Sequence, residues 1–156
     1  MSKKKRITDF TIARLLAVFE QDLYNLFEYT PKKFRFSLEQ FLKNTLDNAV
    51  RLVMKCLDTP PEEPYLLRLK RDMLIEAHSE LRVVEFRLNQ LNDLCAMSNE
   101  TKAKFDIQLF EIYGNLERFA NSLNKRLKEE SDAAGFDPQR DSEHDRDAGL
   151  QWRTSS

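Results

Sequence analysis

Apolar residues recur in this chain at alternating intervals of four and three residues over four separate segments. This spacing places them on one face of a helix that packs against other helices, because seven residues complete two turns of a supercoiled helix. The pattern therefore predicts four amphipathic helices. Their seam residues are Ile12, Leu16, Phe19, Leu23 and Leu26; Leu42, Leu46, Ala49, Val53 and Cys56; Leu74, Ala77, Leu81, Val84, Leu88, Leu91 and Cys95; and Phe105, Leu109, Ile112, Leu116, Phe119 and Leu123.

The first two helices should be joined by a basic and aromatic elbow. Pro31 disfavours helical backbone at the residue before it, so the first helix is predicted over about residues 9–29. Ser37 followed by Gln40 has the spacing of a capping box, which predicts a second helix over about residues 38–58. The elbow is therefore expected to be a non-helical turn.

The other two connections are also marked in the sequence. Thr59–Pro64 holds three prolines and cannot continue a helix. The third helix is predicted over about residues 65–97, and Ser98-Asn99 should end it and cap a fourth helix over about residues 100–130.

These segments predict an all-α protein folded as an up-down-up-down antiparallel four-helix bundle. Only 3 of the 156 residues are glycine, too few for a turn-rich β protein. We expect a basic N-terminal arm over residues 1–8, the bundle over 9–130 and a disordered acidic tail over 131–156. Lys and Arg outnumber Asp and Glu by 22 to 20 before residue 131 (+2), whereas the tail has 3 against 6 (−3).

The first helix carries more apolar residues than one packing face requires. Its additional residues are Leu15, Val18, Tyr24 and Phe27. The surplus predicts a second buried surface, which is consistent with assembly of the bundle into a homo-oligomeric barrel.

The sequence offers little material for catalysis. It has no glycine-rich phosphate loop, nucleophile elbow or His-Glu-x-x-His motif. One of its two histidines lies in the predicted tail, and neither has a glutamate three residues before it, as di-metal bundles require. His78 shares a helical stripe with Arg71, Ile75 and Arg82, which predicts a surface or boundary position. We therefore expect a protein that is not an enzyme and has no metal, cofactor or small-molecule substrate.

Cys56 and Cys95 are predicted to be buried free thiols, because both fall on apolar helical faces and no Cys-x-x-Cys spacing occurs. No apolar run is long enough to span a membrane, and none follows the basic N-terminus as a signal peptide requires. We expect a cytoplasmic protein without a membrane partner.

Basic residues recur along the predicted surface. We predict nucleic-acid contacts through phosphates, with the elbow aromatics Phe34 and Phe36 stacking on bases. Alternatively, these are solvated helix faces with ion pairs between residues four apart. A further basic group is expected early in the third helix, at Arg68, Lys70 and Arg71. The predicted nucleic-acid-binding residues are Lys32, Lys33, Arg35, Arg82 and Arg87.

Four sequence features resemble a known family over residues 10–125. They are Pro31-Lys32-Lys33 in the elbow, the helix from Leu38 to Leu57, Leu81-Arg82 with Arg87-Leu88, and the run Glu111-Ile112-Tyr113-Gly114-Asn115-Leu116. The chain resembles the accessory variability determinant proteins of diversity-generating retroelements. These belong to a wider four-helix-bundle group that includes proteins encoded in ribosomal RNA intervening sequences.

The resemblance implies a barrel-shaped homopentamer that binds a reverse transcriptase and template RNA or cDNA. It also implies a non-catalytic role in mutagenic reverse transcription. The family has a Gly-Gly-Trp-like turn of helix where this chain has Glu117-Arg118-Phe119, and its better-known members are strongly basic, whereas this chain has a net charge of −1. The alternative is a self-associating structural or adaptor bundle without nucleic-acid binding.

Overall fold

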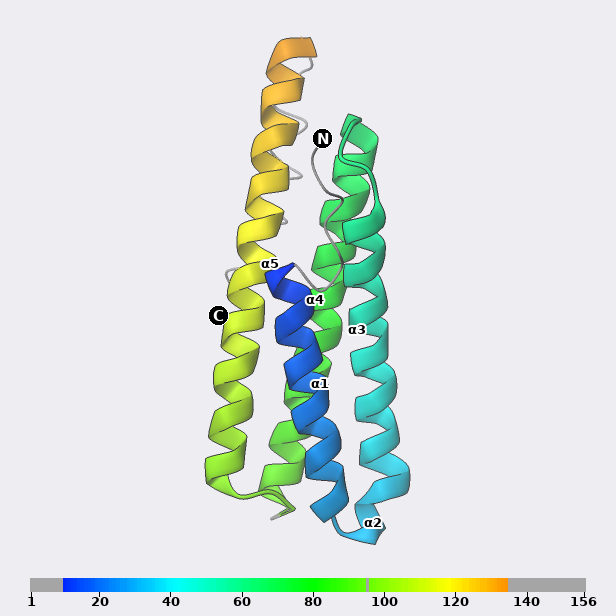
Figure 1. The fold of residues 1–156 in the computed structure, drawn as a ribbon, viewed down its shortest axis with the longest axis vertical. Helices are drawn as coiled ribbons and strands as arrows, with labels where there is room; N and C mark the ends of the chain where they lie inside the picture. The colour runs from blue at the N-terminus through cyan, green and yellow to red at the C-terminus, as the bar shows by residue number, and fades with distance from the viewer. Residues whose placement is uncertain (1–9, 95, 135–156) are drawn as a thin grey trace.

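The computed structural model describes residues 10–94 and 96–134, and every regular element in them is helical (Figure 1). The predicted all-α class is therefore confirmed. Within these residues, none of the helices combines the length and the apolarity needed to cross a membrane. The predicted arm at residues 1–8, Cys95 and residues 135–156 of the predicted tail lie outside the described part. The elements are α1 (Thr11–Tyr29), α2 (Lys32–Phe34), the π-helical turn η2 (Arg35–Glu39), α3 (Gln40–Asp58), α4 (Pro64–Asp93) and α5 (Asn99–Ala134).

The four long helices α1, α3, α4 and α5 lie side by side and alternate in direction along the molecule (Figure 1). α4 packs against both α3 and α5, and α1 contacts both α5 and α3. Between α1 and α5, the Phe19 and Phe105 rings meet edge to face with 5.5 Å between their centroids. Beside them, Gln108 Nε2 donates a 2.7 Å hydrogen bond to Asp22 Oδ2. These contacts join the first helix of the chain to the last.

Most predicted seam positions line the core, although Ile12 and Leu26 of α1 are only half-buried against it. The run from Leu74 to Leu91 in α4 is buried at each of its predicted positions. In α5 the seam departs from the prediction, because Ala120 is fully buried whereas Phe119 is only half-buried. A straight α-helix turns once in 3.6 residues, so its buried face drifts away from a strict seven-residue repeat. Phe119 is turned towards α4, where its ring centroid lies 5.8 Å from Lys70 Nζ.

The elbow is largely helical, so the predicted start of the second helix at Leu38 is wrong. Helical backbone begins at Lys32, directly after Pro31, and continues through η2 into α3. Ser37 therefore lies inside the helical segment instead of capping it. Nothing between Lys32 and Glu39 interrupts the backbone, because no proline or glycine occurs there. The helical backbone widens to a π-helical turn over Arg35–Glu39 before α3 begins.

A buried lysine caps the end of α3. Lys70, only 5% exposed, donates hydrogen bonds to the backbone carbonyls of Cys56 (2.6 Å) and Thr59 (2.7 Å). The Cys56 carbonyl also accepts a 3.3 Å hydrogen bond from the Thr59 backbone N–H, and the negative end of the helix dipole favours a cation there. Arg126 of α5 donates to the carbonyl of Pro61 at 2.9 Å, so two cations hold the proline-rich loop. The prediction that Lys70 belongs to a basic surface is therefore wrong.

The ends of α4 and α5 differ from the predicted boundaries by a few residues. α4 ends at Asp93 instead of Met97, and α5 continues to Ala134, past the expected end at Glu130. The predicted cap of the last helix is present, because Ser98 Oγ accepts a 3.1 Å hydrogen bond from the Thr101 backbone N–H.

Replacing the Lys70 ammonium should destabilise the fold. Lys70→Met keeps most of the apolar stem but leaves the carbonyls of Cys56 and Thr59 without their charged donor. We expect a loss of about 3 kcal/mol in the free energy of unfolding, measured by urea denaturation. The matched control is Lys55→Met, because Lys55 is exposed near the same end of α3; it should change stability by less than about 0.5 kcal/mol. Equal effects of the two substitutions would contradict a capping role for Lys70.

Candidate nucleic-acid interface

The predicted nucleic-acid-binding residues are spread over several places. Lys32 and Lys33 are exposed in α2, at the end of the molecule where α1 connects to α3 (Figure 1). Arg35 lies in the η2 turn, and its side chain is outside the described part. Arg82 and Arg87 both belong to α4 but contact different neighbouring helices. The structure therefore does not join the predicted residues into one patch.

Of the two elbow aromatics predicted to stack on bases, only Phe34 has a described side chain. Phe34 is half-buried and packs against the core, so much of its ring is covered. Lys33 Nζ lies 4.9 Å from the centroid of that ring. The side chain of Phe36 lies outside the described part. The elbow therefore has exposed lysines, whereas the ring of Phe34 is partly covered because it packs against the core.

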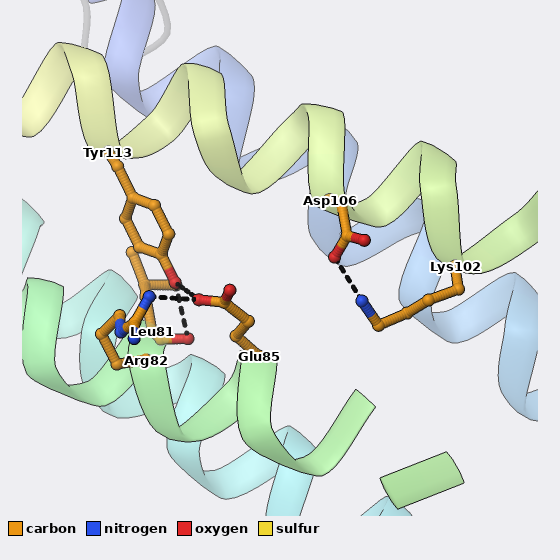
Figure 2. A network of polar contacts seen from close by, with 6 residues as sticks. All are labelled: Leu81, Arg82, Glu85, Lys102, Asp106 and Tyr113. Atoms are coloured by element: carbon orange, nitrogen blue, oxygen red, sulfur yellow. Dashed lines mark hydrogen bonds and ion pairs between the residues drawn. The ribbon is translucent and has the colours of Figure 1, made fainter. Parts of the chain in front are cut away.

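Arg82 belongs to a polar network between α4 and α5 (Figure 2). Its Nη1 lies 3.0 Å from Glu85 Oε2, to which it donates in an ion pair. The Tyr113 hydroxyl of α5 donates to the same oxygen at 2.7 Å and lies 3.2 Å from the Leu81 carbonyl. Burial, reinforced by the neighbouring Glu85 carboxylate, raises the pKa of Tyr113. The carboxylate therefore offsets the charge of Arg82 and reduces what this arginine offers to a phosphate.

His78 is buried beside this network, so the predicted surface or boundary position is wrong. Its ring centroid lies 4.7 Å from that of Tyr113. α4 is covered on both sides by neighbouring helices, which buries positions next to the seam as well as those on it. Burial, with a smaller contribution from the positive charge of Arg82, lowers the pKa of His78 to about 4. The imidazole is therefore neutral at physiological pH.

The predicted basic group early in the third helix is mostly internal. Arg71 is 3% exposed, and its Nη1 donates a 3.2 Å hydrogen bond to Asn124 Oδ1 of α5. Its Nε lies 3.7 Å from a carboxylate oxygen of Asp72. With Lys70 also buried, only Arg68 of this group is exposed. The expected basic surface at the start of α4 is therefore absent.

Arg87 contacts two exposed phenylalanines, one from each of two helices. Its guanidinium carbon is 5.5 Å from the ring centroids of both Phe41 in α3 and Phe86 in α4. Its Nη1 donates a 2.9 Å hydrogen bond to Gln90 Oε1. Each of the two phenylalanine residues is 56% exposed. We call this arrangement the Phe41–Arg87–Phe86 stack. Cation–π contacts with both rings hold the guanidinium in place while leaving much of each ring open to solvent.

Phe41 and Phe86 were not identified from the sequence. Phe41 lies one residue before the seam position Leu42, and Phe86 lies two residues before the seam position Leu88. In the sequence, each is therefore indistinguishable from a residue that flanks an apolar stripe. The available signal was an aromatic residue away from the seam on each of two helices. The sequence could not pair them, because their proximity depends on how α3 and α4 are aligned.

The described residues offer little to a metal or a nucleophilic reaction. No group of three or more His, Cys, Asp or Glu side chains within the described ranges could hold a metal ion. Cys56 is a buried free thiol, as predicted. Burial raises its pKa to about 11, against a weaker opposing effect of Lys70. The thiol is therefore protonated at neutral pH and a poor nucleophile.

Stability should depend on pH through His78. The folded-state pKa of about 4 lies below the ordinary value of 6.5, so the unfolded chain binds more protons between these limits. This contribution to stability is fully present above pH 6.5 and is lost as pH falls towards 4, by up to about 3 kcal/mol. His78→Phe keeps an aromatic ring against Tyr113 and removes the titration. We expect urea denaturation at several pH values to show a flatter profile for the variant; parallel profiles would contradict this assignment.

Comparison with known proteins does not assign the chain to a family. Its sequence matches no protein-family model, and no curated protein matches it. The inference of function therefore depends on the chain's own residues and on the sequence features quoted above.

Proposed function

We propose that the chain is a non-catalytic accessory subunit of a reverse transcriptase. It binds the enzyme and its template RNA, or the cDNA copied from it, and supports mutagenic reverse transcription in a diversity-generating retroelement. The protomer is an up-down-up-down antiparallel four-helix bundle that assembles with further copies; the family resemblance implies a barrel of five. The chain functions in the cytoplasm.

The observation that carries this proposal is the Phe41–Arg87–Phe86 stack. Exposed aromatic rings bind single-stranded nucleic acids because every base can stack on them, whatever the sequence. The guanidinium beside the rings supplies a positive charge next to the stacking surface. Arg87 contacts the second residue of α3, so the stack lies towards the same end of the molecule as Lys32 and Lys33. Bases would stack at the rings while these lysines contact phosphates.

The two contributions can be separated by their dependence on salt. Phosphate contacts release counterions, so Lys32→Ala with Lys33→Ala should reduce the slope of log affinity against log salt by about 1.4 for single-stranded RNA. Phe41→Leu with Phe86→Leu should weaken binding by about 2 kcal/mol without changing that slope, because stacking involves no counterion release. Fluorescence anisotropy of a labelled single-stranded RNA measures both.

Tyr65→Leu is the matched control for the aromatic substitutions. Tyr65 is 59% exposed near the beginning of α4, at the opposite end of that helix from Phe86. Its replacement should leave RNA affinity unchanged. Equal losses for Tyr65→Leu and the double phenylalanine variant would contradict the stack as the binding site. If the double lysine variant leaves the salt slope unchanged, the elbow lysines are not part of the binding site.

Partner binding is tested by co-expression with the reverse transcriptase that the proposal expects to be encoded beside this gene. Affinity purification of the tagged chain should retain the enzyme together with RNA. After nuclease treatment the enzyme should still be retained if the two proteins contact each other directly. A preparation that contains neither the enzyme nor RNA would refute the accessory-subunit proposal.

A second candidate function is a self-associating structural or adaptor bundle that binds no nucleic acid. It is favoured by apolar side chains that the fold leaves open. Val18 and Tyr24 of the first helix are 54% and 44% exposed, although Phe27 is buried in the core. On α5, Ile107 and Phe110 are 62% and 77% exposed. A purified oligomer that shows no RNA binding even at low salt would support this alternative.

A further inference from the structure

The outer face of α5 carries an apolar stripe with the spacing of a second packing seam. Its members are Ala103, Ile107, Phe110 and Gly114, at intervals of four, three and four residues. Ala103, Ile107 and Phe110 are exposed, and Phe110 is the more open of the two large side chains. The buried face of the helix, with Leu109, lies on its other side. In Figure 1, α5 lies at the edge of the molecule with α1 and α4 towards its inner side.

Gly114 has no role in packing within the described part of the chain. Among the described residues, a Cβ at this position would meet only guanidinium nitrogens of Arg118, the nearer at 3.5 Å. Glycine in the interior of a helix is less favourable than alanine, so the fold gains nothing from it here. A small residue on an outer face does allow the backbone of another helix to approach closely.

The charges beside the stripe are complementary to those of a second copy of the same helix. Lys104 and Glu111 are both exposed on one flank, one heptad apart. In an antiparallel pair of α5 helices, each residue on this flank faces the same flank of the other copy. Lys104 then lies opposite Glu111 of the second copy, and the two-fold symmetry repeats this ion pair. Lys102 and Asp106 already pair within α5 (Figure 2), so their charges are used internally.

We propose that the occupant of this stripe is a second copy of the chain, bound through antiparallel α5–α5 packing. In the register set by the two ion pairs, Ile107 lies opposite Phe110 of the second copy, and Ala103 lies opposite Gly114. By symmetry each of these layers occurs twice. The contact is isologous, because the same surface is used by both copies.

Charge selects this register over its neighbours. Sliding the helices by one heptad in one direction places Lys104 opposite Lys104 of the second copy. Sliding them in the other direction places Glu111 opposite Glu111. Both alternatives bring like charges together, which disfavours them. The stripe ends where Glu100 and Glu117 occupy the next seam positions, so the contact is short and its dissociation constant is expected on the order of micromolar.

This interface holds copies in pairs and does not depend on RNA binding. An isologous contact cannot by itself close a ring of five, because every interface of such a ring joins two different surfaces. Sedimentation equilibrium of the full chain should therefore show a reversible doubling of mass with concentration, of the single chain or of the ring that the resemblance implies, and the variants below that disrupt the contact should weaken or abolish it. A monomer at every concentration, or a pentamer that the variants below leave unchanged, would overturn the proposal without bearing on RNA or enzyme binding.

Charge reversal tests the register while leaving the core untouched. Lys104→Glu and Glu111→Lys should each weaken the dimer by about tenfold, because each replaces two attractive pairs with two repulsive ones. The double variant restores opposite charges and should recover wild-type affinity. Lys128→Glu is the control, because it makes the same charge change at an exposed position of α5 away from the stripe. Failure of the double variant to recover would refute the register.

Gly114→Leu separates association from folding. The added Cβ makes only an ordinary contact with the flexible Arg118 side chain, and leucine improves helix propensity, so the thermal midpoint should not fall. In the dimer the leucine side chain would collide with Ala103 of the second copy, and association should be lost. Circular dichroism melting and sedimentation measure the two effects on the same samples. A variant that dimerises like the wild type would contradict close packing at Gly114.

Discussion

Burial of α4 on two sides is the constraint on which the rest of the structure depends. This helix packs against both α3 and α5, so its covered surface extends well beyond one heptad seam. Polar side chains next to the seam must then find partners inside the protein, because an unpaired buried charge is costly. Lys70 donates hydrogen bonds to the carbonyls at the end of α3, and Arg71 donates one to Asn124 of α5. His78 avoids the cost by staying neutral against Tyr113.

Cationic side chains that bind partners inside the protein are not available to a ligand. These internal contacts therefore determine how much positive charge remains at the surface. Two arginines of α4 were predicted to bind nucleic acid. The charge of Arg82 is the more neutralised of the two, because Arg82 forms an ion pair with Glu85. Arg87 instead contacts two partly exposed aromatic rings. Such a surface favours stacking over electrostatic attraction, which suits a chain whose net charge is only −1. Binding that depends on stacking is also less sensitive to salt than binding through phosphates alone.

The predictions from sequence succeeded where the heptad pattern dominates. Residues from Leu74 to Leu91, spaced by fours and threes, are buried because no other arrangement covers that stripe. The same reasoning placed Cys56 in the core, and the capping signal at Ser98 marked the start of the last helix. Prediction from sequence failed at Ser37, because the helical backbone starts directly after Pro31 and continues past the local capping signal. It also failed at His78, whose burial depends on a neighbouring helix.

The sequence by itself determined that the chain is helical, where most of its seams lie and that its proline-rich loop interrupts them, because these properties follow from local periodicity and from backbone chemistry. Tertiary structure decided which polar residues became internal and which aromatics stayed outside. Lys70 and Lys33 are both lysines in helical segments, yet one caps α3 and the other faces solvent. Likewise Phe41 and Phe86 both contact Arg87 only because α3 and α4 are aligned in one register. Such pairings depend on distances between helices, which no spacing along a single helix contains.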